Sequence, residues 1–191
     1  KNQFPKGTLI VHETVGYTDY SIGQFFKYAQ KQPWFKNTIF VITADHSALT
    51  GQKEFQTELG LFKIPIIFYS PMLKHGLVSQ KFMQQIDIFP TLNDMLHNDK
   101  PVFAFGKSIF STFPHYYLYF SNGEYLLMIG DYMSKYREGY PTELYNAKKD
   151  PDYEHNVANL YPKITEYHTR LTKAIIQQYN NRLIKNQTTV K

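Results

Sequence analysis

The sequence predicts an α/β fold with a small antiparallel β subdomain and a helix at its C-terminal end. Apolar runs typical of strands alternate with helical patterns through the first half of the chain, which is the order found in layered α/β folds. From about residue 114 the pattern changes to short aromatic runs joined by turn residues. We therefore expect two domains, residues 1–113 and residues 114–191.

Three elements are expected in the first domain before residue 70. Residues 11–31 carry apolar side chains at helical spacing and predict an amphipathic helix. Residues 37–44 form a short, nearly continuous apolar run, which is typical of a strand buried on both faces, as in a parallel sheet. A second strand is predicted over residues 64–69, with Pro65 at its beginning because proline has no N–H to donate.

The later elements follow from turn and cap signals. Asp87 is a plausible N-cap for the next helix. Two β-prone runs flank the pair Asn122-Gly123, which predicts a hairpin over residues 116–129. A third short strand includes Leu144-Tyr145, and the helical pattern of residues 161–186 presents one apolar stripe to this sheet.

The composition is that of a packed globular protein. Of the 191 residues, 42% are hydrophobic, which is enough apolar mass for a core, and 19% are charged, which is low for a disordered chain. The net charge is +5, but lysines and arginines are scattered, so we expect no nucleic acid partner, while an anionic substrate stays open. The absence of cysteine excludes disulfides, thiolate nucleophiles and zinc–thiolate sites.

The chain shows no membrane-spanning or targeting segment. No apolar run approaches the roughly 18 residues that such a helix needs, so we expect the chain itself to be soluble. It begins at Lys1 without an initiator methionine or a signal-peptide pattern. We therefore expect it to be a piece of a longer protein.

The best chemical signal is the pair Asp45-His46, because it directly follows a predicted buried strand. In open α/β sheets, ligands bind in the crevice outside the carboxyl ends of strands. A carboxylate and an imidazole both ligate divalent ions such as Mn²⁺ or Zn²⁺, and such an ion polarises a phosphoryl or sulfuryl oxygen. The alternative is structural: Asp45 caps the next turn and His46 makes an ordinary polar contact.

Other polar residues are weaker candidates. Lys53 and Lys63 are placed to neutralise an anionic substrate near residue 45, although a solvated lysine is commoner. Three histidines fall at turns or helix ends, where capping or solvation is the ordinary role: His75, His97 and His155. The chain contains no Gly-rich phosphate loop and no Gly-x-Ser-x-Gly turn, so no catalytic nucleophile is identified in it.

Five segments occur together, in one order, over nearly the whole chain: residues 17–23, 37–46, 64–69, 85–92 and 143–151. They resemble consecutive signatures of the sulfatases within the alkaline phosphatase superfamily. Residues 103–110 and 175–182 further resemble the lipoteichoic-acid-synthase-like branch, the phosphoglycerol transferase type, especially its Bacteroides-like members.

This resemblance implies an alkaline-phosphatase-like sandwich, of which the chain is the C-terminal portion. It implies one divalent ion, Mn²⁺ or Mg²⁺, or Ca²⁺ in a true sulfatase. Of the family's metal ligands only Asp45 and His46 map onto this sequence, while the nucleophile, an acidic ligand and the substrate-binding residues fall in a missing N-terminal half. The isolated chain is therefore expected to be inactive.

The same resemblance implies a sulfatase or a phosphoglycerol or phosphoethanolamine transferase. Its substrate would be a phosphate or sulfate ester, on a lipid head group or a glycan. It also implies an extracytoplasmic domain, periplasmic or on the outer face, of a bacterial membrane-anchored protein. The missing N-terminal half of the domain is itself an expected partner. Without it we expect an exposed apolar edge or face and self-association.

A second hypothesis is a degenerate, non-catalytic module that binds a glycan or a protein through the aromatic hairpin of residues 116–129. Exposed rather than buried Tyr116, Tyr119 and Tyr125 would favour it. We prefer the enzyme hypothesis, because an intact Asp-His pair would be unexpected in a binding module.

Overall fold

The computed structural model describes residues 4–47, 50–74, 76 and 79–190. The chain divides into two compact units, Lys1–Val78 and Ser79–Lys191. The expected boundary between residues 113 and 114 falls inside the second unit and stays a prediction.

The first unit begins with helix α1, Val11–Ala29, which confirms the helix expected over residues 11–31. The imidazole of His12, in its first turn, fastens the segment before the helix, because Nδ1 accepts hydrogen bonds from the backbone N–H groups of Thr8 at 3.0 Å and Leu9 at 3.4 Å. Ala29 is the one residue of α1 classed as buried. The helix therefore keeps much of its apolar surface in contact with solvent.

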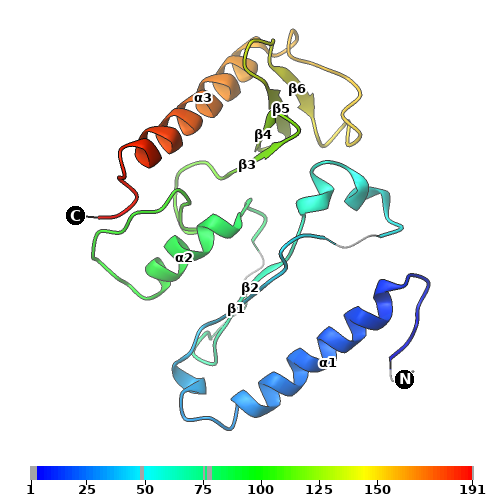
Figure 1. Ribbon diagram of the computed structural model, residues 1–191, viewed down its shortest axis with the longest axis vertical. Coiled ribbons are helices and arrows are strands. Elements are labelled where there is room, and N and C mark those ends of the chain that lie inside the picture. Colours follow the sequence, from blue (N-terminus) through cyan, green and yellow to red (C-terminus); the bar gives the residue numbers. More distant parts are fainter. Residues whose placement is uncertain (1–3, 48–49, 75, 77–78, 191) are drawn as a thin grey trace. The chain divides into compact units, whose positions relative to one another are not determined.

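Strands β1, Phe40–Thr43, and β2, Ile66–Tyr69, pair in the first unit (Figure 1). Both strands were expected, but the expected parallel, doubly buried environment is wrong: they form an antiparallel two-stranded sheet with Phe40 opposite Tyr69, and their side chains are half-buried or exposed. The described residues that join them contain only the short 3-10 turns η2, Lys53–Gln56, and η3, Gly60–Phe62. Without a crossover helix, the chain returns antiparallel.

Aromatic contacts attach α1 to this sheet. The ring of Phe26 on α1 lies 5.1 Å from that of Phe40 and 5.5 Å from that of Tyr69, and the buried Phe35 packs 5.5 Å from Phe40. These edge and tilted ring pairs are favourable. The core of the first unit is thus small and largely aromatic.

In the second unit, Asp87 organises the start of helix α2, Ile88–Met95. Asp87 holds the N-cap position as expected, but its side chain does not cap α2. The buried carboxylate instead accepts the backbone N–H of Gln84 and that of Lys107, both at 2.8 Å. It therefore ties the turn before α2, η4 (Gln85–Asp87), to a loop twenty residues later.

A four-stranded antiparallel sheet follows, in the order β3-β4-β5-β6. The predicted hairpin is confirmed: Asn122 and Gly123 join its strands with φ of 51° and 84°, as a type I′ turn requires. A second hairpin turns at Gly130, φ 57°, and leads into a strand that the sequence analysis missed. The strands are β3 (Tyr116–Ser121), β4 (Glu124–Ile129), β5 (Tyr132–Tyr136) and β6 (Glu143–Asn146).

Helix α3, Pro162–Ile184, packs on the middle strands β4 and β5, as expected for the C-terminal helix (Figure 1). On its inner side His168 is buried, with Nδ1 3.1 Å from the hydroxyl of the buried Ser134 on β5. Leu127, Met133 and Leu144 of the sheet are fully buried. The second unit therefore has its own hydrophobic core, which is formed by side chains of its four-stranded sheet.

Candidate metal centre

Asp45 and His46 follow the end of β1 after one residue, Ala44, close to the position expected from the sequence. Their side chains are 87% and 68% exposed, so both heads reach solvent. The next residue, Ser47, fixes the loop: its backbone N–H and its hydroxyl both donate to the carbonyl of Leu61, at 3.1 and 2.7 Å. Asp45 and His46 therefore lie on an exposed loop whose next residue, Ser47, is held by hydrogen bonds to Leu61.

The two side chains are oriented by the backbone around them. One carboxylate oxygen of Asp45, Oδ1, accepts the N–H of His46 at 2.9 Å, which is the local cap expected in the structural alternative. Nδ1 of His46 lies 2.8 Å from the carbonyl oxygen of Ser47. Because a carbonyl only accepts, this contact requires a proton on Nδ1, so in the neutral imidazole the lone pair is on Nε2.

The remaining donors fit part of the coordination shell of a divalent ion. Oδ2 of Asp45 and Nε2 of His46 lie 3.6 Å apart. Oxygen and nitrogen ligands bind at about 2.0–2.2 Å, so two ligands of one ion stand about 3–4 Å apart. A carbonyl on the second imidazole nitrogen is also the usual support of a metal-binding histidine. Two donors are nevertheless too few, and no group of three His, Cys, Asp or Glu side chains that could hold an ion occurs among the described residues.

The two lysines considered for an anionic substrate differ in their surroundings. Lys63 forms an ion pair with Glu54, both exposed, and its ammonium lies 5.7 Å from the ring centre of Phe55. Its charge is therefore already neutralised. Lys53 is the first residue of η2 and is exposed.

The weaker histidine candidates take local roles. His97 follows α2 with φ of 50°, at the end of the helix. His155 lies beside Asp150, which accepts its backbone N–H at 2.8 Å. His75 lies outside the described residues. Neither described histidine joins Asp45 and His46 in a group that could hold an ion.

The hypothesis of a non-catalytic binding module requires that three tyrosines of the aromatic hairpin be exposed. Tyr116, Tyr119 and Tyr125 are half-buried rather than exposed. Tyr116 instead lies under the ammonium of Lys107, 3.8 Å from its ring centre, and Lys107 also donates to the carbonyl of Pro114. Burial lowers the pKa of Lys107, and the nearby Asp87 carboxylate raises it by less.

Three further polar residues, His168, Lys81 and His115, were not predicted from the sequence. Burial of His168, on the inner side of α3, lowers the pKa of its imidazole to about 4. Lys81 and His115 both contact the carbonyl of Ser111 beside a pocket of the second unit. No local pattern marks these residues, because their partners lie elsewhere in the chain or are backbone carbonyls.

Comparisons with known proteins extend this description. The profile of the Sulfatase family matches residues 12–98, which include Asp45 and His46. A sulfatase of Formosa agariphila is 29% identical over 85 residues, covering 42% of this chain and 17% of that protein. Arylsulfatase K of Danio rerio is 23% identical over 184 residues, covering 83% of this chain and 35% of that protein.

Solved structures show the same fold. A protein of the alkaline phosphatase superfamily from Vibrio parahaemolyticus superposes with a TM-score of 0.77 at 17% identity, covering 100% of this chain and 46% of that one. A protein solved with its substrate, D-glucosamine-2-N,6-O-disulfate, gives a TM-score of 0.65 at 22% identity, covering 90% of this chain and 41% of that one.

The chain thus has the fold of the alkaline phosphatase superfamily, which confirms the expected fold class. Within that class the matches support the sulfatase family, a family of hydrolase-type enzymes that generally use a divalent metal ion. The chain spans less than half of the length of each of these relatives. Among the described residues, no helix is long and apolar enough to cross a membrane.

Proposed function

We propose that this chain is part of a metal-dependent hydrolase of sulfate or phosphate esters, with Asp45 and His46 as two ligands of one divalent ion. The observation that carries the proposal is the pair of donor atoms, Oδ2 of Asp45 and Nε2 of His46, which lie 3.6 Å apart on the exposed loop after β1. The sulfatase profile covers this pair, which links the donors to a family of known chemistry.

In this proposal, the residues of the chain prepare the site. The carbonyl of Ser47 accepts a hydrogen bond from Nδ1 of His46, which orients the imidazole so that Nε2 is the nitrogen that would ligate the ion. The contact between Oδ1 of Asp45 and the N–H of His46 turns Oδ2 toward the same space. When bound, the ion would supply a Lewis acid that polarises the ester's sulfuryl or phosphoryl oxygen and activates a nucleophile.

The remaining parts of the reaction are supplied by residues outside this chain. Covalent transfer needs a positioned nucleophile and further ligands, and no group of three potential ligands occurs in the described part of the chain. The isolated chain is therefore inactive in this proposal. Mn²⁺, Mg²⁺ and, in a true sulfatase, Ca²⁺ are the ions that suit a carboxylate-containing site.

One relative supports the substrate class that we propose. One similar protein was solved with D-glucosamine-2-N,6-O-disulfate as its substrate, which supports a sulfated glycan as the first substrate to test. An extracytoplasmic domain of a bacterial membrane-anchored protein is the location we propose. This location would bring the enzyme to extracellular glycans or to lipid head groups.

A second candidate is phosphoglycerol transfer. Residues 103–110 and 175–182 favour it, because they resemble the lipoteichoic-acid-synthase-like branch. The two candidates share the metal pair and differ in the nucleophile and in the ester that is cleaved. Both differ from a non-catalytic module, which needs neither donor of the pair.

The test uses the longer protein and compares Asp45→Ala with Asp152→Asn, which alters an exposed carboxylate far along the sequence. Hydrolysis of an aryl sulfate and of an aryl phosphate is measured with Mn²⁺, Mg²⁺ or Ca²⁺. We expect Asp45→Ala to abolish turnover and Asp152→Asn to retain it, because losing one ligand removes the charge clamp on the ester. Wild-type turnover in Asp45→Ala would refute the assignment.

A further inference from the structure

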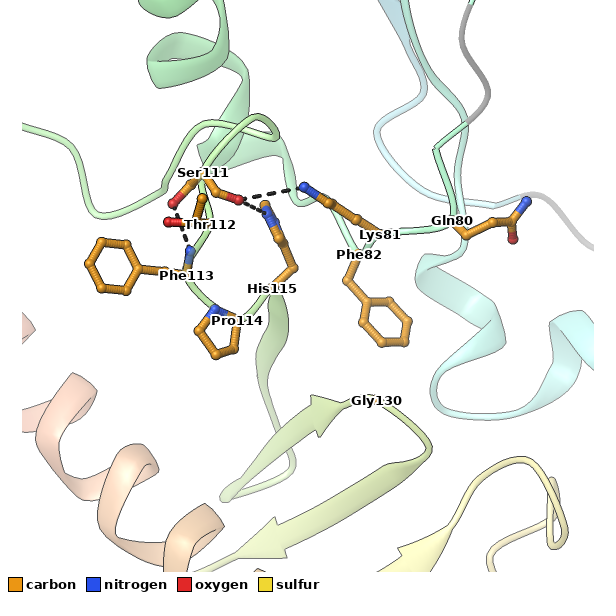
Figure 2. A pocket seen from close by; sticks show the side chains of 9 residues that line it. All are labelled: Gln80, Lys81, Phe82, Ser111, Thr112, Phe113, Pro114, His115 and Gly130. Atoms are coloured by element: carbon orange, nitrogen blue, oxygen red, sulfur yellow. Dashed lines mark hydrogen bonds between the residues drawn. The ribbon is translucent and has the colours of Figure 1, made fainter.

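A pocket of about 310 Å³ lies within the second unit, away in sequence from the candidate metal centre. Two segments line it, residues 80–82 and residues 111–115, together with Gly130 from the turn between β4 and β5 (Figure 2). Its size is at the lower end of small-molecule sites. Nothing in the proposed reaction uses it.

One end of the pocket is cationic. The ammonium of Lys81 donates to the carbonyl oxygen of Ile109 at 3.1 Å and to that of Ser111 at 3.5 Å. The same Ser111 carbonyl lies 3.2 Å from Nε2 of His115, as the dashed lines in Figure 2 show. An ammonium has three N–H donors, so one donor of Lys81 is left for a ligand.

The charge of Lys81 is not balanced inside the pocket. None of the nine lining residues is an aspartate or a glutamate. Its ammonium donates two hydrogen bonds to neutral carbonyl groups, which do not neutralise its positive charge. This end of the pocket therefore favours an anionic group.

The rest of the lining is amphipathic. Phe82, Phe113 and Pro114 provide apolar walls, and Phe113 is 74% exposed, so its ring is accessible to a ligand. Gln80 and Thr112 add an amide and a hydroxyl. A sugar ring has the matching chemistry, because its C–H faces pack on apolar side chains while its hydroxyl groups reach amide and hydroxyl partners.

We propose that this pocket binds one saccharide unit that carries an anionic group, sulfate or carboxylate, with that group at Lys81 and the ring against Phe113. The choice of a saccharide rests on the proposed function, whereas the anionic group follows from the pocket itself. The proposed site is built from residues of the second unit alone.

The experiment measures binding to this chain in the presence of a chelator, so that no divalent ion contributes. Ligand-observed saturation-transfer NMR is recorded with D-glucosamine-2-N,6-O-disulfate, and its dissociation constant is obtained by titration. We expect Lys81→Gln to weaken binding about tenfold by removing a charge-assisted contact, and Phe113→Ala to weaken it about fivefold by removing a packing surface.

Two variants serve as matched controls. Lys163→Gln removes an exposed ammonium on α3, and Phe110→Ala removes an exposed ring outside the pocket lining. Both should bind the probe as the unaltered chain does. Far-ultraviolet circular dichroism checks that each variant is folded, and Phe113→Ala keeps the test valid if Lys81→Gln does not fold.

Three results would overturn the proposal. The first is no binding of the disulfated sugar at millimolar concentration. The second is equal binding by the pocket variants and the controls. The third is full competition by inorganic sulfate at the affinity of the sugar, which would indicate a bare anion site. Because the readout is binding without metal, it stands whether or not the longer protein hydrolyses an ester.

Discussion

Lowering the pH should weaken the attachment of α3 to its sheet through His168. This imidazole is buried between α3 and β5, where Nδ1 contacts the hydroxyl of Ser134, and Thr172 one turn later is also fully buried. Burial lowers the pKa of His168 to about 4, from an ordinary value near 6.5. The folded state therefore holds the imidazole neutral.

The size of the effect follows from this pKa difference. The unfolded chain binds a proton on His168 below about pH 6.5, and the folded chain does so only below about pH 4, so the free energy of unfolding falls as the pH drops through this window. The loss is about 2 kcal/mol at pH 5 and about 3 kcal/mol at pH 4, relative to neutral pH. Above about pH 7.5 the contribution of His168 is constant.

Urea denaturation followed by circular dichroism at several pH values measures this loss. The variant His168→Gln keeps a hydrogen-bonding side chain but cannot take up the proton, so its stability should change less between pH 7 and pH 5, by about 2 kcal/mol. Other titrating groups are common to both proteins and cancel in the difference. Equal pH dependence of the two proteins would refute the account of His168.

Three further outcomes are expected. Gly106→Ala should destabilise the second unit by about 2–4 kcal/mol, because a Cβ there would lie 2.1 Å from the carbonyl oxygen of Ile86. Thermal melting measures this loss, with Gly51→Ala as the control, because a Cβ at Gly51 meets nothing within 4 Å. Equal melting temperatures of the two variants would contradict the prediction. The chain should self-associate through exposed apolar side chains such as Val15 and Phe25, so light scattering that finds only monomer at high concentration would be against it. Mn²⁺ should raise the melting temperature of the isolated chain very little, since a pair of donors binds weakly; a large rise would mean that the chain holds a complete site.

The elements that the sequence predicted well are those set by local signals. The spacing of apolar residues places α1 and α3, and the Asn122-Gly123 pair places the first hairpin with its positive φ values. The strand β5 was missed because Ser134 and Lys135 interrupt its apolar pattern. Ser134 is nevertheless fully buried, since its hydroxyl has a partner in His168, 34 residues away.

The pairing of β1 with β2 shows a different limit. A short apolar run fits both a doubly buried parallel strand and a half-buried antiparallel one, and the choice depends on the path of the connecting chain. For the candidate site, position after a strand was enough to select Asp45 and His46. Their supports were not predictable, because the carbonyls of Ser47 and Leu61 carry no sequence signal. The same holds for Lys81, whose carbonyl partners lie 28 and 30 residues away.

The most direct test of the central claim is the position of a divalent ion in the longer protein to which we propose this chain belongs. Crystals soaked in Mn²⁺ give an anomalous signal that locates the ion without reference to activity. The proposal expects one ion about 2.0–2.2 Å from both Oδ2 of Asp45 and Nε2 of His46, with Nδ1 of His46 still on the carbonyl of Ser47. An ion bound elsewhere, with Asp45 and His46 outside its coordination shell, would contradict the claim.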